Sequence, residues 1–400
     1  MKYIVILGDG MADEPIEALG GKTPIEYAVT PTMDRLAPVS ELGLAATIPA
    51  GMKPGSDTAN LAVLGYDPKK YYTGRSPLEA LSIGVDMRED DIAIRCNIVT
   101  LSEEAVPYEE RTILDHSSDE ISTEEAAVLL EAVREAFETE EYKFYVGTSY
   151  RHLLIWAHGK VTELVPPHDI LTKKIGDYLP EDTVLREMMK KSFDVLNHHP
   201  INEKRAAEGK NKANSIWFWG AGTRPALSSF KEKTGKDGVM ISAVDLLKGI
   251  AVGAGMRNIT VPGANGGLHT NYEGKAEAAV RAVLEEGADF VYVHVEAPDE
   301  MGHQGSAPRK VEAIEYLDQR LICPVTERMD ASGEDYRLLI LPDHPTPISC
   351  RTHVSTPVPY LLYDSRRREG SGLLYSEKNG AAAGNFMEEG YRLMDHFLET

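Results

Sequence analysis

The hydrophobic residues of this chain form short continuous runs separated by longer segments with helical periodicity. The runs have the length of buried strands and end at polar or glycine residues; they cover residues 3–7, 43–48, 239–242, 290–295, 338–341 and 360–363. Residues 271–286 and 308–329 have the apolar spacing that is typical of amphipathic helices. Strands that are apolar throughout and alternate with helices are typical of a parallel sheet covered on both faces. The pattern therefore predicts an α/β fold with a doubly wound, mostly parallel sheet.

The pattern changes in the middle of the chain, where strands and helices stop alternating regularly. Residues 123–138 have the periodicity of an amphipathic helix, and the short apolar runs at residues 144–146 and 153–156 suggest antiparallel strands. Residues 196–214 are polar, and we interpret them as a turn-rich return to the main sheet. These features indicate a smaller α+β domain that is inserted into the larger one.

The changes in pattern also set the expected domain boundaries. We expect a core domain formed by residues 1–90 and 212–400, and an inserted domain formed by residues 91–211. The apolar run at residues 215–219 is then the first core strand after the insertion. In open α/β sheets, functional groups gather beyond the carboxyl ends of the strands. We therefore expect the chemistry at that edge of the core domain.

Composition and charge restrict the class of protein. The chain has 400 residues, of which 42% are hydrophobic and 26% are charged, as is typical of a globular protein with a sizeable core. Its formal net charge of −21 argues against nucleic acid and against an anionic membrane as partners. No apolar run reaches the roughly 18 residues that a membrane span requires. An anionic substrate would need local cations to offset the charge of the protein.

The amino terminus and the cysteines suggest a cytoplasmic protein. The apolar run at residues 3–7 is too short for a signal peptide and leads directly into a Gly-Asp-Gly motif at residues 8–10. The three cysteines, Cys96, Cys323 and Cys350, show neither a disulfide framework nor the spacing of a zinc finger. The oligomeric state stays open at this point.

The stretch at residues 52–65 suggests a nucleophile. A Pro-Gly pair forms a predicted turn, and Ser56 stands where a helix begins, with Leu61 and Leu64 spaced for one buried face. A serine at this position lies near free backbone N–H groups and the positive end of the helix dipole, where an anion is favoured. The simpler alternative is that Ser56 only caps the helix. The acidic residues and histidines elsewhere in the chain favour the nucleophile.

Acidic residues and histidines follow three of the predicted strands. They are Asp9, Asp299 with His303, and Asp343 with His344 and, nine residues further on, His353. Asp299 and His303 face the same way if the chain between them is helical. Neutral imidazole and carboxylate ligands together suit zinc or manganese better than calcium. Each feature alone could be structural, but three such groups at strand ends indicate a metal site.

These motifs resemble the alkaline phosphatase superfamily and, within it, the shorter, archaeal-type cofactor-independent phosphoglycerate mutases. The resemblance covers nearly the whole chain. It rests on residues 8–10, 54–60, 299–305 and 343–344 with His353, and on further family motifs at residues 20–24, 65–68, 72–80, 217–220 and 271–275. The resemblance implies an alkaline phosphatase-like core with an inserted domain.

The resemblance also implies a phosphotransfer site with two divalent metal ions, Mn²⁺ or Zn²⁺, with Mg²⁺ as a further candidate. One ion would be held by Asp299, His303 and His353, and the other by Asp9, Asp343, His344 and the Ser56 oxygen. Coordination to a dication lowers the pKa of a serine hydroxyl so that it can attack phosphorus. Ser56 would carry the phosphoryl group as phosphoserine and pass it to a second hydroxyl, while the inserted domain closes over the site.

The substrate implied by the resemblance is a small phosphorylated compound. Lys275 would contact the phosphoryl group, and the candidates for substrate binding are Asn60, Arg75, Arg95, Arg151 and His152. Each arginine could equally belong to a structural ion pair. The mutases interconvert 3-phosphoglycerate and 2-phosphoglycerate in glycolysis, whereas some relatives of this length have been proposed to be homoserine kinases, which act in threonine biosynthesis. A binding module with a decayed site fits less well, because every expected ligand is present.

One stretch departs from the mutases. Where they have a basic sequence resembling Asp-Arg-Arg-Ala-Gly-Arg, this chain has Leu-Asp-His-Ser-Ser-Asp-Glu at residues 114–120, with only Arg111 nearby. An acidic surface is less suited to a phosphate than to an amine such as that of homoserine. The alternative is that this loop faces solvent and that Arg95 and Arg151 bind the anion. The mutase is our first interpretation, and homoserine phosphorylation is the second.

Overall fold

The computed structural model describes residues 1–367 and 369–399 and divides the chain into two compact units. The core unit consists of Met1–Tyr72 and Ala226–Thr400, and the second unit consists of Thr73–Pro225. The second unit therefore extends beyond the expected insertion, residues 91–211, at both ends. None of the helices in the described part of the chain combines the length and the hydrophobicity that crossing a bilayer requires.

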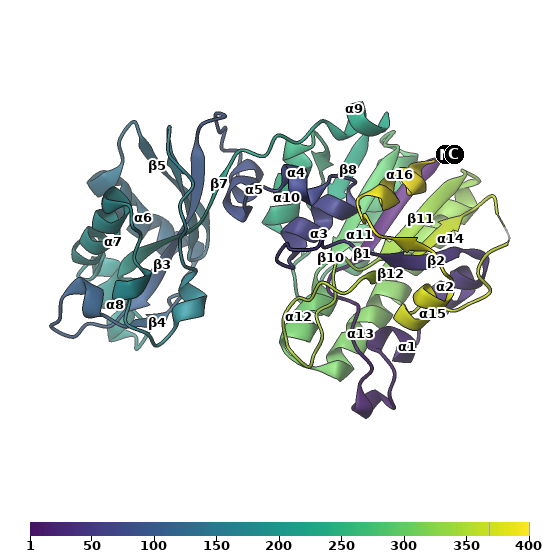
Figure 1. The fold of residues 1–400 in the computed structure, drawn as a ribbon, viewed down its shortest axis with the longest axis horizontal. Helices are drawn as coiled ribbons and strands as arrows, with labels where there is room; N and C mark the ends of the chain where they lie inside the picture. Colours follow the sequence, from purple (N-terminus) through teal and green to yellow (C-terminus); the bar gives the residue numbers. More distant parts are fainter. Residues whose placement is uncertain (368, 400) are drawn as a thin grey trace. The chain divides into compact units, whose positions relative to one another are not determined.

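The core unit is built on an eight-stranded sheet with the order β13-β2-β12-β11-β1-β10-β8-β9 (Figure 1). Its strands are β1 (Lys2–Gly8), β2 (Glu41–Ala45), β8 (Gly238–Ile241), β9 (Arg257–Asn258), β10 (Phe290–Val295), β11 (Tyr336–Leu341), β12 (Val358–Asp364) and β13 (Phe386–Met387). The strands from β11 to β9 run parallel, as does the pair β13–β2, whereas β12 is antiparallel to both of its neighbours. The predicted doubly wound, mostly parallel sheet is confirmed.

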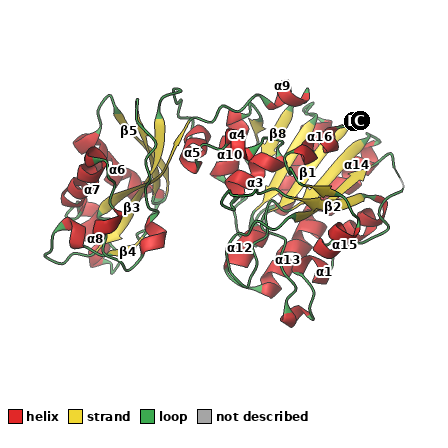
Figure 2. Cartoon of the chain, in the orientation of Figure 1, coloured by secondary structure: helices red, strands yellow, loops and turns green. Residues whose placement is uncertain are grey.

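Helices cover both faces of this sheet (Figure 2). They are α1 (Pro24–Tyr27), α2 (Pro31–Leu36), α3 (Ser56–Val63), α4 (Pro68–Tyr71), α9 (Phe230–Thr234), α10 (Asp245–Gly253), α11 (Tyr272–Leu284), α12 (Ala297–His303), α13 (Ala307–Leu317), α14 (Cys323–Ser332), α15 (Glu377–Ala382) and α16 (Arg392–Leu398). Alternate residues of a strand point to opposite faces. Ile4 and Ile6 of β1 accordingly join the core beneath α11, whereas the Tyr3 ring meets Phe397 of α16 at 5.6 Å between ring centroids.

The second unit has a five-stranded sheet in which β3 is central. Its strands are β3 (Ile92–Leu101), β4 (Ile113–Asp115), β5 (Tyr142–Thr148), β6 (Arg151–Trp156) and β7 (Ser215–Thr223), and its helices are α5 (Arg75–Ser82), α6 (Thr123–Phe137), α7 (Thr183–Leu196) and α8 (Pro200–Ala207). Ile94 and Leu154 pack with residues of α6 and α7 on one face, and Ala93 and Leu153 pack with Ala80 of α5 on the other.

The structure corrects two expectations about this unit. The strand at residues 215–219 does not enter the main sheet, because β7 pairs antiparallel with β3 from Ile92↔Thr223 to Val99↔Ser215. The polar segment at residues 196–214 is not only turns, since it contains α8, which begins after the N-cap residue His199. A strand with only apolar residues looks the same in either sheet, so the local pattern could not assign the partner of β7. This pairing, with α5 packed on β3 and β7, explains why the second unit is longer than expected.

Candidate active site

Acidic residues and histidines of the core unit meet at the carboxyl ends of β1, β10 and β11. Asp9 directly follows β1, and Gly10 then turns the chain with a φ of 60°. A Cβ atom at position 10 would lie 2.5 Å from Oδ1 of Asp299, so this close approach requires glycine. The Gly-Asp-Gly motif thus brings Asp9 next to a carboxylate that is far away in the sequence.

Ser56 is the first residue of α3, and its hydroxyl faces the histidines. Gly55 occupies the N-cap position and offers no side chain to the helix. Ser56 Oγ lies 3.1 Å from Nε2 of His344. The alternative that Ser56 merely caps the helix therefore does not describe this geometry, because the cap residue is Gly55 and the serine hydroxyl interacts with a distant histidine.

Asp9, Asp343 and His344 form a buried group, which we call the inner triad. His344 Nε2 lies 3.5 Å from Asp9 Oδ1 and 3.5 Å from Asp343 Oδ2, and the three side chains are at most 3% exposed. Among the described residues, Asp9 Oδ1 finds no hydrogen-bond partner although it is buried. Burial and the negative charges of Asp343 and Asp299 raise the pKa of Asp9 well above its usual value. The inner triad thus offers an unsatisfied buried oxygen to a cation.

Asp299, His303 and His353 form a more exposed group, the outer triad. His303 Nε2 lies 3.2 Å from Asp299 Oδ2 and 3.1 Å from His353 Nε2, and His353 Nε2 lies 3.5 Å from Asp299 Oδ1. The Asp299 and His303 side chains meet because both lie on α12. The His303 and His353 side chains are 36% and 23% exposed. The hydrogen bond to Asp299 raises the pKa of His303 to about 9, so this position attracts positive charge.

The two triads together form a donor set that fits divalent cations. His303 Nδ1 lies 2.9 Å from the carbonyl oxygen of Arg351 and donates its hydrogen there, so Nε2 is the ring nitrogen that faces the triad and would bind a cation after losing its proton. His344 joins the triads, because its ligand atom also lies close to those of Asp299 and His353. Thr346 donates a hydrogen bond to Asp299 and holds that carboxylate in place. Three carboxylates and three imidazoles in this arrangement suit zinc or manganese.

Two other candidates, Asn60 and Lys275, lie beneath the triads and are buried. Asn60 Nδ2 donates to the carbonyl oxygen of Ser56 and to Asp343 Oδ2, both at 2.8 Å, and its side chain has no exposed surface. Asn60 is therefore placed to hold Ser56 and Asp343, and its expected contact with substrate stays a prediction. Lys275 Nζ donates to the carbonyl oxygen of His294 at 2.6 Å. Burial, opposed by the charge of Glu296, lowers the pKa of Lys275 to about 8.

The three candidate arginines lie together in the second unit. Arg75 Nε and Arg95 Nη2 both contact Oε1 of Glu79, at 3.0 and 3.2 Å. Burial lowers the pKa of Arg95 to about 10; the charges of Arg75 and Arg151 act in the same direction, and Glu79 opposes them. Arg75, Arg95 and Arg151 thus form a cationic group, which we call the arginine cluster. The Glu79 carboxylate forms ion pairs with two of its members, Arg75 and Arg95.

A series of aromatic rings continues from this cluster. The Arg95 guanidinium lies 4.8 Å from the ring centroid of Trp219, and the Trp219 ring lies 5.2 Å from that of His168. His116 continues the series at 6.0 Å from His168 and 5.7 Å from Tyr150. Trp219 belongs to one of the family motifs, at residues 217–220. The other three rings, those of His116, Tyr150 and His168, belong to no motif in the sequence that would have predicted their position here. The surface that results combines guanidinium groups with imidazoles and suits an anion.

His152 does not lie with the arginines. It alternates with Arg151 and Leu153 along β6 and therefore points to the opposite face of the sheet, where it is only 1% exposed. Its Nδ1 accepts a hydrogen bond from the backbone N–H of Gly147 at 3.1 Å. Burial lowers its pKa to about 4. The structure thus places His152 in the core of the second unit, apart from the three arginines, and its expected role in substrate binding stays a prediction.

The acidic loop at residues 114–120 is held by its own carboxylates. Asp115 accepts hydrogen bonds from the backbone N–H groups of Ser117 at 2.8 Å and Asp119 at 2.6 Å. Asp119 accepts another from the backbone N–H of Asn211 at 2.6 Å. These bonds stabilise residues 118–120, which have φ values of 52°, 55° and 49° in the left-handed region. The departure from the basic stretch of the mutases therefore has a structural reason.

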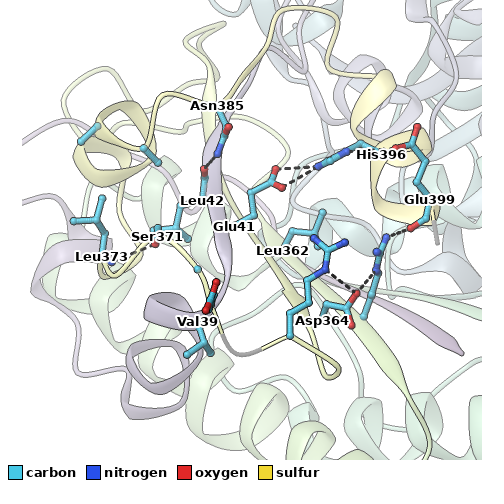
Figure 3. Close-up of a pocket in the computed structure, with 16 residues that line it drawn as sticks. Val39, Glu41, Leu42, Leu362, Asp364, Ser371, Leu373, Asn385, His396 and Glu399 are labelled. Atoms are coloured by element: carbon cyan, nitrogen blue, oxygen red, sulfur yellow. Dashed lines mark hydrogen bonds and ion pairs between the residues drawn. The ribbon is translucent and has the colours of Figure 1, made fainter.

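A cavity of about 610 Å³ lies elsewhere in the core unit (Figure 3). It is lined by Arg337 at the start of β11, whereas Asp343 follows the end of that strand. Its charged groups satisfy one another: Arg337 Nε donates to Asp364 at 2.8 Å, and His396 Nε2 lies 3.0 Å from Glu41. Because it lies at the other end of β11 from the triads, we do not assign it to the reaction.

Known proteins of related sequence cover the whole chain. The family model described as 2,3-bisphosphoglycerate-independent phosphoglycerate mutase matches residues 37–202. A protein named as a probable enzyme of this kind, from Geobacter sulfurreducens, is 48% identical over 405 residues and covers 100% of both chains. The 2,3-bisphosphoglycerate-independent phosphoglycerate mutase of Methanosarcina barkeri is 49% identical over 390 residues, which is 96% of each chain.

Two solved structures share the fold over nearly their full length. A protein from Pyrococcus horikoshii superposes with a TM-score of 0.82 and 31% identity, and the match covers 99% of this chain and 97% of that one. The cofactor-independent phosphoglycerate mutase of Thermoplasma acidophilum has a TM-score of 0.66 and 26% identity, with 100% and 99% covered. From this full-length similarity, the chain belongs to the family of 2,3-bisphosphoglycerate-independent phosphoglycerate mutases.

Proposed function

We propose that this protein interconverts 3-phosphoglycerate and 2-phosphoglycerate in a metal-dependent reaction that passes through phospho-Ser56. The observation that carries the proposal is the position of the serine hydroxyl. Ser56 Oγ lies 3.1 Å from His344 Nε2, and His344 belongs to the inner triad while its ligand atom also lies close to those of Asp299 and His353 in the outer triad. The mutase names of the full-length relatives indicate the substrate pair.

Two divalent ions fit the side chains around Ser56. Asp299, His303 and His353 would hold one ion, and Asp9, Asp343, His344 and the Ser56 oxygen would hold the other. Bound dications of this kind lower the pKa of a coordinated hydroxyl and offset the charge of a phosphoryl group. The mixed carboxylate and imidazole donors favour Mn²⁺ or Zn²⁺, with Mg²⁺ as a further candidate.

The residues of the chain then position the groups that react. Ser56, at the amino end of α3, forms a bond from Oγ to phosphorus while the bond from phosphorus to the substrate oxygen breaks, and the proton lost by the serine ends on that released oxygen. The hydroxyl oxygen on the second carbon of the retained glycerate then forms a bond to phosphorus, and the bond from phosphorus to Ser56 Oγ breaks. The proton of that hydroxyl returns to the serine. Lys275 would attract the phosphoryl group with its ammonium charge, as the matching lysine of the family is expected to do.

The arginine cluster would bind an anionic group of the substrate. Arg75, Arg95 and Arg151 carry three positive charges, and Glu79 compensates one of them. Guanidinium groups pair with carboxylate and phosphate oxygens in bidentate geometry. We assign this role to the arginines, because Asn60 is bonded to Ser56 and Asp343 and His152 points to the opposite face of its sheet.

Homoserine phosphorylation receives no support from the loop that suggested it. The carboxylates of Asp115 and Asp119 accept hydrogen bonds from backbone groups of their own unit, so they are engaged without an amine ligand. We therefore retain the mutase as the proposed function.

A coupled assay tests the proposal directly. Purified protein loaded with Mn²⁺ is given 3-phosphoglycerate, and 2-phosphoglycerate is detected through enolase; in parallel, homoserine and ATP are tested for phosphohomoserine. Mutase turnover, together with a phosphoryl group found on Ser56 by mass spectrometry, is the expected result. Phosphohomoserine formation without mutase turnover would overturn the proposal.

A further inference from the structure

Strand β10 presents two buried polar side chains to the inner triad. Tyr292 and His294 are two residues apart and therefore lie on the same face of the sheet, and neither has exposed surface. Their neighbours Val291, Val293 and Val295 point to the other face, into the hydrophobic core. Neither Tyr292 nor His294 is a potential metal ligand of the triads, so burial of these polar groups calls for a different explanation.

His294 holds one oxygen of Asp9. Its Nε2 lies 2.9 Å from Asp9 Oδ2, and its Nδ1 lies 3.3 Å from Ser242 Oγ. Ser242 Oγ already accepts a hydrogen bond from the backbone N–H of Val244 at 3.0 Å, so its hydroxyl hydrogen is available to Nδ1. The imidazole then carries its own hydrogen on Nε2 and donates it to Asp9 Oδ2. The other oxygen, Asp9 Oδ1, is the buried one without a partner, and it faces His344.

Tyr292 acts on Asp343 through Asn60. The Tyr292 hydroxyl donates to Asn60 Oδ1 at 2.6 Å, and Asn60 Nδ2 donates to Asp343 Oδ2 and to the carbonyl oxygen of Ser56. If the amide were reversed, its oxygen would face the two acceptor oxygens of Asp343 and Ser56. The tyrosine hydroxyl therefore favours the orientation in which the amide ties the first residue of α3 to the metal-ligand loop.

We propose that Tyr292 and His294 are positioning residues that set how Asp343 and Asp9 present their oxygens to the cation of the inner triad. The inference rests on the proposed function, because it assumes that the inner triad holds a divalent ion. Each residue acts on one carboxylate, and both lie on one rigid strand next to β1. Partners that orient metal ligands in this way typically change metal affinity by about 10- to 100-fold when they are removed.

Direct titration of the metal-free, full-length protein with Mn²⁺ tests this inference without measuring turnover. The variants are Tyr292→Phe, which removes only the hydroxyl, and His294→Asn, whose amide is too short to reach Asp9. His294→Gln is the conservative variant, because its amide nitrogen can take the place of Nε2. Calorimetry and electron paramagnetic resonance would give the affinity and the number of bound ions, and a His353→Ala background would isolate the inner triad.

Tyr292→Phe and His294→Asn should each weaken Mn²⁺ binding by the inner triad about 10- to 100-fold, while the outer triad keeps its affinity. His294→Gln should restore the wild-type affinity. Tyr375→Phe is a matched control, since Tyr375 is also buried and its hydroxyl donates to the Pro359 carbonyl oxygen at 2.9 Å. It should change thermal stability without changing Mn²⁺ binding.

Unchanged affinity in both Tyr292→Phe and His294→Asn would overturn the inference, and so would an equal loss at both triads that follows the melting temperature. If wild-type protein binds two Mn²⁺ ions and the variants behave as wild type, the inference fails while the proposed function stands. If the variants behave as expected but the wild type has no mutase turnover, the proposed function fails while the positioning role stands.

Discussion

The two charged clusters of this protein differ in the sign of the charge that they gather and in how much of that charge the chain compensates. The triads of the core unit bring three carboxylates together and leave a buried oxygen of Asp9 without a partner among the described residues. In the arginine cluster, Arg75 and Arg95 share the carboxylate of Glu79, and Arg95 lies over the ring of Trp219. The buried Arg95 Nε, like Asp9 Oδ1, has no hydrogen-bond partner among the described residues.

This difference determines what each cluster reveals about its ligand. Adjacent buried carboxylates are unfavourable unless a cation joins them, so the triads indicate a bound cation even before any is placed there. In the arginine cluster, Glu79 compensates part of the charge, and the guanidinium groups of Arg95 and Arg151 lie over the rings of Trp219 and Tyr150. The buried Arg95 Nε still lacks an acceptor among the described residues, so this cluster favours an anion. We therefore expect the core unit to govern the chemical step and metal binding, and the arginine cluster to govern affinity for the substrate.

The largest effect is expected for the nucleophile. Ser56→Ala should lower the mutase rate by about 10⁴-fold or more, because no other hydroxyl takes the place of Oγ. The other six ligand side chains remain, so the variant should still bind Mn²⁺ in calorimetry. Ser40→Ala is the control, since Ser40 is buried and donates to the Leu36 carbonyl oxygen at 2.8 Å, away from the triads. A Ser56→Ala protein with a near-normal mutase rate would contradict the assignment of Ser56 as the nucleophile.

The next largest effect is expected for metal removal, which should depend on the triads and not on the arginine cluster. Exhaustive chelation should abolish turnover, and Mn²⁺ or Zn²⁺ should restore it. At 100 times its dissociation constant, a bound ion should stabilise the folded protein by about 2.7 kcal/mol, measured as a rise in melting temperature. Addition of Mn²⁺ should raise the melting temperature of Arg95→Ala as much as that of the wild type. It should raise the melting temperature of Asp343→Asn much less. Full activity in protein shown by elemental analysis to contain no metal would contradict this assignment.

A smaller effect is expected in the second unit. Arg95→Ala should raise KM for 3-phosphoglycerate about 10- to 100-fold, which corresponds to the roughly 1.5–3 kcal/mol of a charged hydrogen bond, and should change kcat much less. Arg134→Ala is the control, because Arg134 belongs to the same unit and forms ion pairs with Glu131 and Glu138, away from the arginine cluster. If Arg95→Ala lowers kcat and leaves KM unchanged, the division of roles between the clusters is wrong.

The smallest effect is a pH dependence that originates in the core unit. Burial lowers the pKa of Lys275 to about 8, so its ammonium charge is present below that pH and is lost as the pH rises through it. The value of kcat/KM should therefore fall above about pH 8, by up to tenfold per pH unit. Arg95 keeps its charge over this range, because its pKa stays at about 10. Lys275→Met should be less active at pH 7 and should lack this decline.

The sequence by itself determined the α/β sheet and the residues that gather at its edge. Continuous apolar runs such as residues 290–295, which alternate with helices, are typical of a parallel sheet that is covered on both faces, and the residues that follow such strands lie at one edge of it. Asp9, Asp299 and Asp343 are therefore expected at the same edge of the sheet, and they become neighbours because β1 lies between β10 and β11. The pair Asp299 and His303 also follows from local spacing, since one helical turn places both on one face.

Only the tertiary structure decided which partners meet across the sheets and which face each side chain takes. The strand β7 looks like a core strand in sequence but pairs with β3, because pairing depends on long-range register and not on local pattern. His152 lies next to Arg151 in the chain and on the opposite face in space, since successive residues of a strand alternate. The links of Asn60 to Asp343 and of His294 to Asp9 join residues far apart in sequence, so their hydrogen bonds exist only once the strands and α3 have been packed together.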